Sequence, residues 1–136
     1  MKTLLEKLGY KTGTPSLLWR GPDELIDQFE GLSTAGAAPP TFHVAFVRSR
    51  SELAEAAQEV AAAYRPGHHL WFCYPKKSGK LKTDLTRDLG WEPIHELDLL
   101  GVAQVSLDET WSGLRFRLRS EIRSITRKSP TGGRLS

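Results

Sequence analysis

The residues best suited to chemistry follow an apolar run that ends in a lysine-rich loop. The run Leu70–Tyr74 stops at Pro75, and a helix is expected to open at Thr83–Asp84. A strand, a cationic loop with a glycine and a helix start, in this order, form a place where an anion can bind backbone N–H groups. The predicted ligand-binding residues are Lys76, Lys77, Ser78, Gly79, Lys80, Thr83 and Asp84.

Two interpretations of this loop stay open. It is either an anion site or a solvated turn in which lysines supply solubility. It is not a P-loop, because no G-x-x-x-x-G-K-[ST] runs through it. Asp84 and Asp88 lie four residues apart on one expected helical face, so together with Lys80 they form the candidate centre of a cryptic enzyme. Alternatively, the two carboxylates serve the helix dipole and a surface ion pair.

Other patterns typical of catalysis, metals or cofactors are missing from the sequence. The four histidines show no metal-ligand spacing, there is no C-x-x-C or G-x-S-x-G, and Cys73 lies inside an apolar run. The turn Arg20–Asp23 lacks G-x-G-x-x-G, and Arg48 and Arg50 stand where a ribose-binding acid is needed. We therefore predict no catalytic residue, no metal and no cofactor, and neither NAD nor S-adenosylmethionine binding.

Basic residues are concentrated toward the end of the chain. From Gly113 onward there are seven, opposed only by Glu121, although the net charge of the whole chain is +3. Such asymmetry can mark an anionic partner, so a nucleic-acid-associated protein is the alternative function. Alternatively, the arginines of this stretch form a charged face that keeps the edge of a sheet from pairing with another molecule. The candidate nucleic-acid contacts are Arg115, Arg117, Arg119 and Arg123.

The apolar pattern predicts strands and helices in alternation. Strands are expected at Ser16–Arg20, Thr41–Val47, His69–Tyr74, Val102–Leu107 and Trp111–Leu118, from their branched, aromatic and apolar residues. Helices are expected at Met1–Leu8, Asp23–Leu32, from a capping box at Ser49 to Tyr64, and at Thr83–Leu97 with a kink or break near Gly90 and Pro93.

This order predicts an α/β fold: a three-layer Rossmann-like sandwich of about five strands, mostly parallel, with a C-terminal antiparallel hairpin. Residues 1–119 are expected to form a single domain, and residues 120–136 a basic, flexible tail with one helical turn as an option at Glu121–Ile125. Ligands bind such sheets beyond the carboxyl ends of the strands. If the first strand is central, that crevice lies between the Arg20–Asp23 loop and the Pro75–Lys82 loop.

Three ordered motifs resemble a family of small bacterial proteins that is catalogued only as a domain of unknown function. They are L-W-F-x-Y-P-K at Leu70–Lys76, T-D-L-x-R-D at Thr83–Asp88, and D-x-x-W-S-x-L-R-F-R at Asp108–Arg117. The similarity covers nearly all of residues 1–118, and the turn Arg20–Asp23 departs from it. The resemblance implies a bacterial cytoplasmic α/β domain and supplies no activity, cofactor or catalytic residue.

Composition agrees with an ordinary globular domain. The chain is 39% hydrophobic and 26% charged, and it contains one cysteine. Its apolar runs are too short to span a membrane, and its N-terminus has no apolar signal region, so we expect a cytoplasmic protein with no membrane partner. The predicted function is a non-catalytic binding or regulatory module for a small anionic or phosphorylated ligand.

Overall fold

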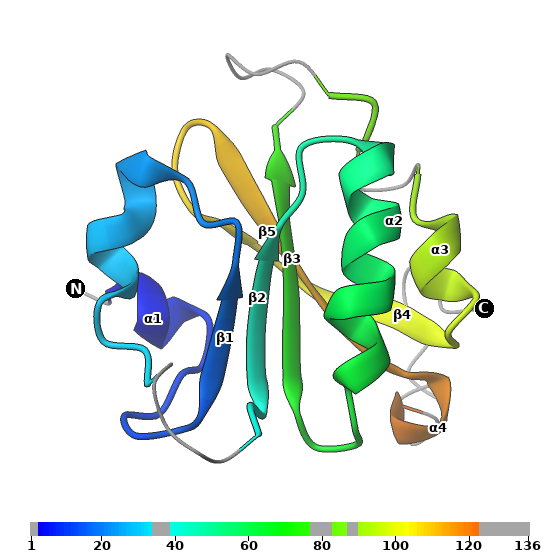
Figure 1. Cartoon of the computed structure of the whole chain (residues 1–136), viewed down its shortest axis with the longest axis horizontal. Coiled ribbons are helices and arrows are strands. Elements are labelled where there is room, and N and C mark those ends of the chain that lie inside the picture. Colours follow the sequence, from blue (N-terminus) through cyan, green and yellow to red (C-terminus); the bar gives the residue numbers. More distant parts are fainter. Residues whose placement is uncertain (1–2, 34–38, 77–82, 87–89, 123–136) are drawn as a thin grey trace.

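One five-stranded mixed sheet organises the computed structural model, which describes residues 3–33, 39–76, 83–86 and 90–122 (Figure 1). The strands are β1 (Ser16–Trp19), β2 (Phe42–Phe46), β3 (His69–Pro75), β4 (Leu99–Ser106) and β5 (Trp111–Leu118). Their order across the sheet is β1-β2-β3-β5-β4. β1, β2 and β3 run parallel, whereas β5 runs antiparallel to both β3 and β4.

The Rossmann-like fold class predicted from the sequence is wrong. Only two of the pairings are parallel, and the other two are antiparallel because β5 inserts between β3 and β4. The helices are too short to form the continuous outer layers of such a sandwich. The chain folds into an α/β structure with one mixed sheet and short helices. β1 also lies at the sheet edge and β2 between its parallel neighbours, so the crevice expected beside a central first strand does not form.

Short helical segments connect the strands. They are α1 (Leu4–Lys7), the 3₁₀ helix η1 (Asp23–Phe29), α2 (Arg50–Glu59), the 3₁₀ helix η2 (Ala61–Ala63), α3 (Glu92–His95) and α4 (Arg119–Ile122). The expected cap of α2 is confirmed, because the Ser49 side chain accepts a hydrogen bond from the Glu52 backbone at 3.2 Å. Figure 1 shows α2 as the longest helix, lying alongside the parallel strands.

The predicted helix Thr83–Leu97 is wrong over most of its described length. Thr83–Thr86 is not helical, and helix α3 begins only at Glu92. One physical reason is Gly90. Its φ of +98° is a left-handed conformation that does not continue a helix, and a Cβ at this position would clash with the side chain of Leu85. Pro93 then occupies the first turn of α3, where its missing N–H costs nothing.

The apolar side chains pack on both faces of the sheet. On one face, α2, η2 and α3 cover residues such as Ala45 and Phe72; on the other, α1 and η1 cover Phe46 and Trp71. Phe46 (0% exposed) and Trp71 (3% exposed) therefore belong to the core. Within the described residues, no helix has the length and apolar character needed to cross a bilayer.

The end of the chain that was expected to be a loose tail begins with a packed helical turn. Ile122 in α4 is buried, and Glu121 accepts a backbone hydrogen bond from Leu118 at 2.9 Å. Residues 120–122 therefore belong to the folded unit. The remaining tail residues lie outside the described part of the chain.

Candidate functional site at the carboxyl edge of the parallel strands

A basic residue follows each of the three parallel strands within two positions. Arg20 follows β1, Arg48 follows β2 and Lys76 follows β3. Because the strands are parallel neighbours, these residues lie along one edge of the sheet. Ligands bind open α/β sheets at this edge. The carboxyl edge therefore gathers positive charge from three separate segments of the sequence.

Arg48 lies at the centre of this edge with only weak partners. Its guanidinium donates to the carbonyl oxygen of Arg20 at 3.3 Å and lies 3.5 Å from the carboxylate of Glu52. It also lies over the indole ring of Trp111, with Cζ 5.3 Å from the ring centroid. Good charged hydrogen bonds are shorter, about 2.7–2.9 Å. The Arg48 side chain, 35% exposed, retains capacity for a further anion.

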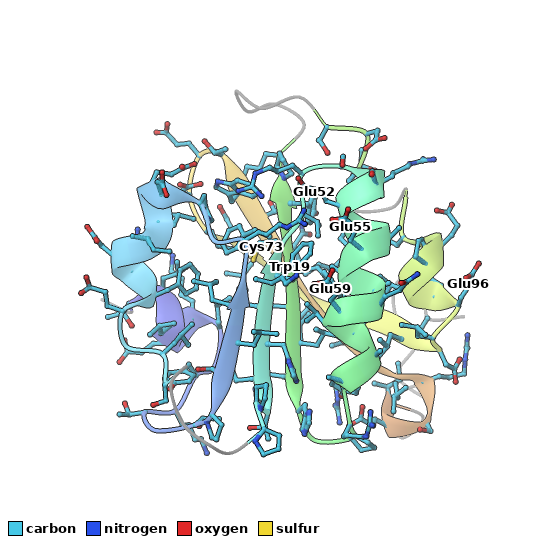
Figure 2. All side chains as sticks on the ribbon, in the orientation of Figure 1. Trp19, Glu52, Glu55, Glu59, Cys73 and Glu96 are labelled. Atoms are coloured by element: carbon cyan, nitrogen blue, oxygen red, sulfur yellow. The ribbon has the colours of Figure 1, made fainter. Side chains whose placement is uncertain are left out.

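Arg20 is held in an unusual backbone conformation beside Arg48. Its φ of +55° lies in the left-handed region, which costs a residue with a side chain roughly 1–2 kcal/mol. The side chain lies over the ring of Trp19 and pairs with Glu55 at 2.8 Å. Figure 2 shows Glu52 and Glu55 on the same helix as Glu59, which accepts a hydrogen bond from Trp19 at 3.1 Å. These contacts anchor the end of β1 to α2.

A pocket of about 300 Å³ opens next to Arg48. The loop Gly21–Glu24 forms one wall, and Arg48 and Trp111 form the rest of the lining. The indole N–H of Trp111 donates to the carboxylate of Glu24 at 3.1 Å, which ties β5 to the first residues of η1. The residues that line the pocket therefore include one basic residue, Arg48, and two acidic ones, Asp23 and Glu24.

The two ends of the lysine loop are attached to different elements. The Lys76 ammonium donates to the hydroxyl of Ser106 at 2.7 Å, and its backbone N–H donates to Thr110 at 2.8 Å, so Lys76 lies against the β4–β5 hairpin. The Lys76 residue is half-buried. At the other end, Thr83 accepts a hydrogen bond from the backbone of Leu85 at 3.1 Å. The predicted site residues Lys77, Ser78, Gly79 and Lys80 lie outside the described residues.

Asp84 binds the start of a helix, but not the helix that was predicted to begin there. Its carboxylate accepts a hydrogen bond from the backbone N–H of Arg50 at 2.8 Å, at the first residue of α2. An anion already occupies this helix terminus. Asp88 and Lys80 are not among the described residues, so the proposed Asp84/Asp88/Lys80 enzyme centre stays a prediction. In the described segments no group of three or more metal-ligating side chains gathers.

Two of the four predicted nucleic-acid contacts have acidic partners. Arg117 lies 3.7 Å from Glu121, and Arg119, which belongs to α4 rather than to β5, lies 3.0 Å from Asp98. Within the described part of the chain Arg115 has no salt-bridge partner, but its side chain is half-buried. Arg123 lies outside the described residues. The positive charge of this stripe is therefore partly neutralised.

A second polar cluster, which the sequence analysis did not find, lies at the amino ends of the parallel strands, just before β3. The Glu121 carboxylate accepts hydrogen bonds from the Tyr64 hydroxyl and from the backbone of Gly67 at 2.8 Å. Burial alone would raise the pKa of Glu121, but these bonds and Arg117 outweigh it and hold that pKa below its ordinary value. Burial and the nearby Glu121 raise the pKa of Tyr64. The cluster joins α4 to the loop before β3.

The buried His43, the half-buried His68 and His69, and the buried Cys73 pack within the fold. Burial, with a smaller contribution from His68, lowers the pKa of His43 to about 4, and its Nε2 lies 3.3 Å from Nδ1 of His68. Burial also lowers the pKa of His69 to about 4, with Arg115 and Arg117 nearby. Full burial raises the pKa of the Cys73 thiol, which keeps it in the unreactive protonated form.

Comparison with known proteins gives no guide to the function, so the geometry of the carboxyl edge is the main guide. No family model matches the chain, and no curated protein matches it. The resemblance to a family of unknown function therefore stays a prediction. The signal for this edge was present in the sequence as single basic residues after each of the first three strands. The sequence analysis placed ligands at this edge, but it considered Arg48 only as an obstacle to nucleotide binding.

Proposed function

We propose that this protein is a non-catalytic binding or regulatory module that recognises a small anionic or phosphorylated ligand at the carboxyl edge of β1, β2 and β3. The observation that supports this most directly is the guanidinium of Arg48, which borders the pocket and whose oxygen partners among the described residues lie at 3.3 and 3.5 Å. A carboxylate or phosphate offers two parallel, shorter bonds to such a group. Binding would thus replace weak contacts by strong ones.

The carboxylates of the pocket narrow the chemistry of the ligand. Asp23 and Glu24 repel a bare polyanion, but they accept hydrogen bonds from hydroxyl groups. A ligand with one anionic group and several hydroxyls satisfies both kinds of lining residue. Sugar phosphates and sugar acids have this composition, and a pocket of about 300 Å³ lies within the size range of small-molecule sites.

The lysine segment extends the proposed site. Lys76, where it begins, follows β3 at the same edge, and Asp84, just beyond it, lies at the start of α2. The cations Lys77 and Lys80 between them would add long-range attraction for an anion. In this proposal Asp84 has a structural role: it holds the far end of the segment, and Arg48 is the main anchor of the ligand.

The test compares two arginine variants. Calorimetry and thermal shift are measured with glucose 6-phosphate and a panel of other sugar phosphates, with glucose and inorganic phosphate as matched probes. Arg48→Gln removes the anchor, and Arg65→Gln removes an exposed guanidinium that bonds the carbonyls of Ala62 and Tyr64 near the opposite edge of the sheet. We expect Arg48→Gln to weaken binding at least about tenfold, since a charged hydrogen bond contributes roughly 1.5–3 kcal/mol.

The outcomes separate the possibilities. Loss of binding in Arg48→Gln but not in Arg65→Gln supports the proposed site. Equal losses in both variants would indicate a general charge effect and contradict it. Unchanged affinity in Arg48→Gln would also overturn it. Tight, salt-dependent binding to random-sequence DNA by the wild type, without any response to sugar phosphates, would favour the nucleic-acid alternative.

A further inference from the structure

The two outer strands of the sheet, β1 and β4, are protected to very different degrees against pairing with another strand. An edge strand presents unpaired N–H and C=O groups, and these pair with other strands unless something blunts them. At one edge, β1 is only four residues long, and Pro15 precedes it. Ser33 also pairs with that edge: its carbonyl accepts a hydrogen bond from the Ser16 N–H at 3.0 Å. The β1 edge is therefore short and partly covered.

The other edge, β4, has almost none of these devices. It extends over eight residues, Leu99–Ser106, with the sequence L-L-G-V-A-Q-V-S, which contains no charged residue and no proline. Within the described residues, β5 is its only strand neighbour. A register shift between Gly101 and Ala103 is the one protective irregularity, and both of these small residues are exposed. Along β4 itself, no charged residue or proline opposes the approach of another strand.

We propose that the β4 edge pairs antiparallel with β4 of a second copy of this chain, which joins the two sheets into one. A two-fold axis pairs residue i of one strand with residue j of the other, and only a residue on the axis faces its own copy. Like charges on such a strand would come close together in many registers, and like charges directly opposite each other destabilise the pairing. A strand without charges avoids this repulsion along its whole length. The contrast with β1, which is blunted in the same molecule, indicates that the unprotected edge is a feature of β4 and not of the fold.

The test uses the full chain and one matched pair of variants. Ala103→Lys places a charge on the proposed interface, and Ala54→Lys places the same charge on an exposed alanine of α2. Molar mass is measured by light scattering and sedimentation over a wide range of protein concentration. We expect a dimer for the wild type and for Ala54→Lys, and at least tenfold weaker dimerisation for Ala103→Lys. Circular dichroism and thermal melting check that both variants fold.

Hydrogen exchange of the wild type provides a readout that depends on no variant. The amides of β4 should become less protected when the protein is diluted below its dissociation constant, while those of β2 should not change. A wild type that stays monomeric at every concentration would overturn the proposal, as would a dimer that survives Ala103→Lys. A monomer whose β4 amides stay protected on dilution would assign the edge to another part of the same chain and overturn it too.

Discussion

The carboxylate of Asp84 and the backbone N–H of Arg50 are joined by a 2.8 Å hydrogen bond across 34 positions of the sequence. The Arg50 side chain returns the contact, because its Nε donates to the carbonyl oxygen of Asp84 at 3.2 Å. This reciprocal pair fixes the start of α2 against the segment that follows the lysine loop. The residues on both sides of the lysine loop are thus fixed: Asp84 by the start of α2, and Lys76 by Ser106 of β4.

The first prediction concerns this pair. Asp84→Ala should lower the free energy of unfolding by about 0.5–2 kcal/mol, the usual contribution of a side chain that caps a helix. Asp84→Asn should retain part of the stability, since an amide oxygen still accepts the hydrogen bond without the charge that favours a helix N-terminus. Urea denaturation measures both. Equal stability of Asp84→Ala and the wild type would contradict the contact.

The second prediction concerns Glu121 and acid. A carboxyl whose pKa is lower in the folded than in the unfolded state stabilises the fold above its unfolded pKa, ordinarily 4.5, and loses that contribution as the pH falls through the folded value. Glu121→Gln should therefore be less stable than the wild type at pH 7, by about 1.5–3 kcal/mol if one charged hydrogen bond dominates. The difference should shrink as the pH falls below about 4.5. A gap that stays constant down to pH 2 would argue against this role.

The third prediction concerns the buried histidine His43. Its folded pKa of about 4 lies below the ordinary 6.5, so the unfolded chain takes up the proton first as the pH falls. As the pH falls from 6.5 to about 4, protonation of His43 in the unfolded chain should lower the free energy of unfolding. Each unit of pKa difference corresponds to about 1.4 kcal/mol. In His43→Leu this part of the pH dependence should disappear, while that of His69 remains. Denaturation curves collected at several pH values measure the change.

The fourth prediction concerns Trp71, which is buried and donates its indole N–H to the carbonyl oxygen of Leu8 at 2.9 Å. Trp71→Ala should cost about 3–5 kcal/mol of stability, the usual penalty for removing a large core aromatic. Trp71→Phe should cost less, because it keeps most of the apolar contact and loses the hydrogen bond. An unchanged denaturation midpoint in Trp71→Ala would show that the tryptophan is not part of the core.

Local patterns were sufficient for the strands and insufficient for the site. β3 and β5 were predictable because apolar or alternating residues stand between clear breaks such as Pro66–Gly67 and the Asp108–Thr110 turn. The helix predicted from Thr83 failed because the role of Asp84 is decided by Arg50, a distant residue that no local window contains. The strand order could not be predicted for the same reason, since the place of β5 between β3 and β4 depends on long-range pairing.

The pocket illustrates the same limit. Glu24 and Trp111 are 87 positions apart, yet their hydrogen bond at 3.1 Å closes one side of it. In the sequence, nothing links Asp23 and Glu24 to Trp111. Arg48 served only as an argument against a nucleotide. Their shared pocket exists because parallel strands bring the ends of β1 and β2 together.

The last prediction tests the acidic side of the proposed site. Asp23→Asn removes a negative charge from the pocket, and Asp27→Asn removes one from an exposed residue farther along η1. If Asp23 accepts a hydrogen bond from a sugar hydroxyl, Asp23→Asn should weaken glucose 6-phosphate binding roughly two- to tenfold, the equivalent of about 0.5–1.5 kcal/mol. The same change should strengthen binding of inorganic phosphate, because the repulsion falls. Titration calorimetry at low salt measures both. Affinities for the two probes that rise together would show that Asp23 only repels anions and that the hydroxyls of the ligand bind elsewhere.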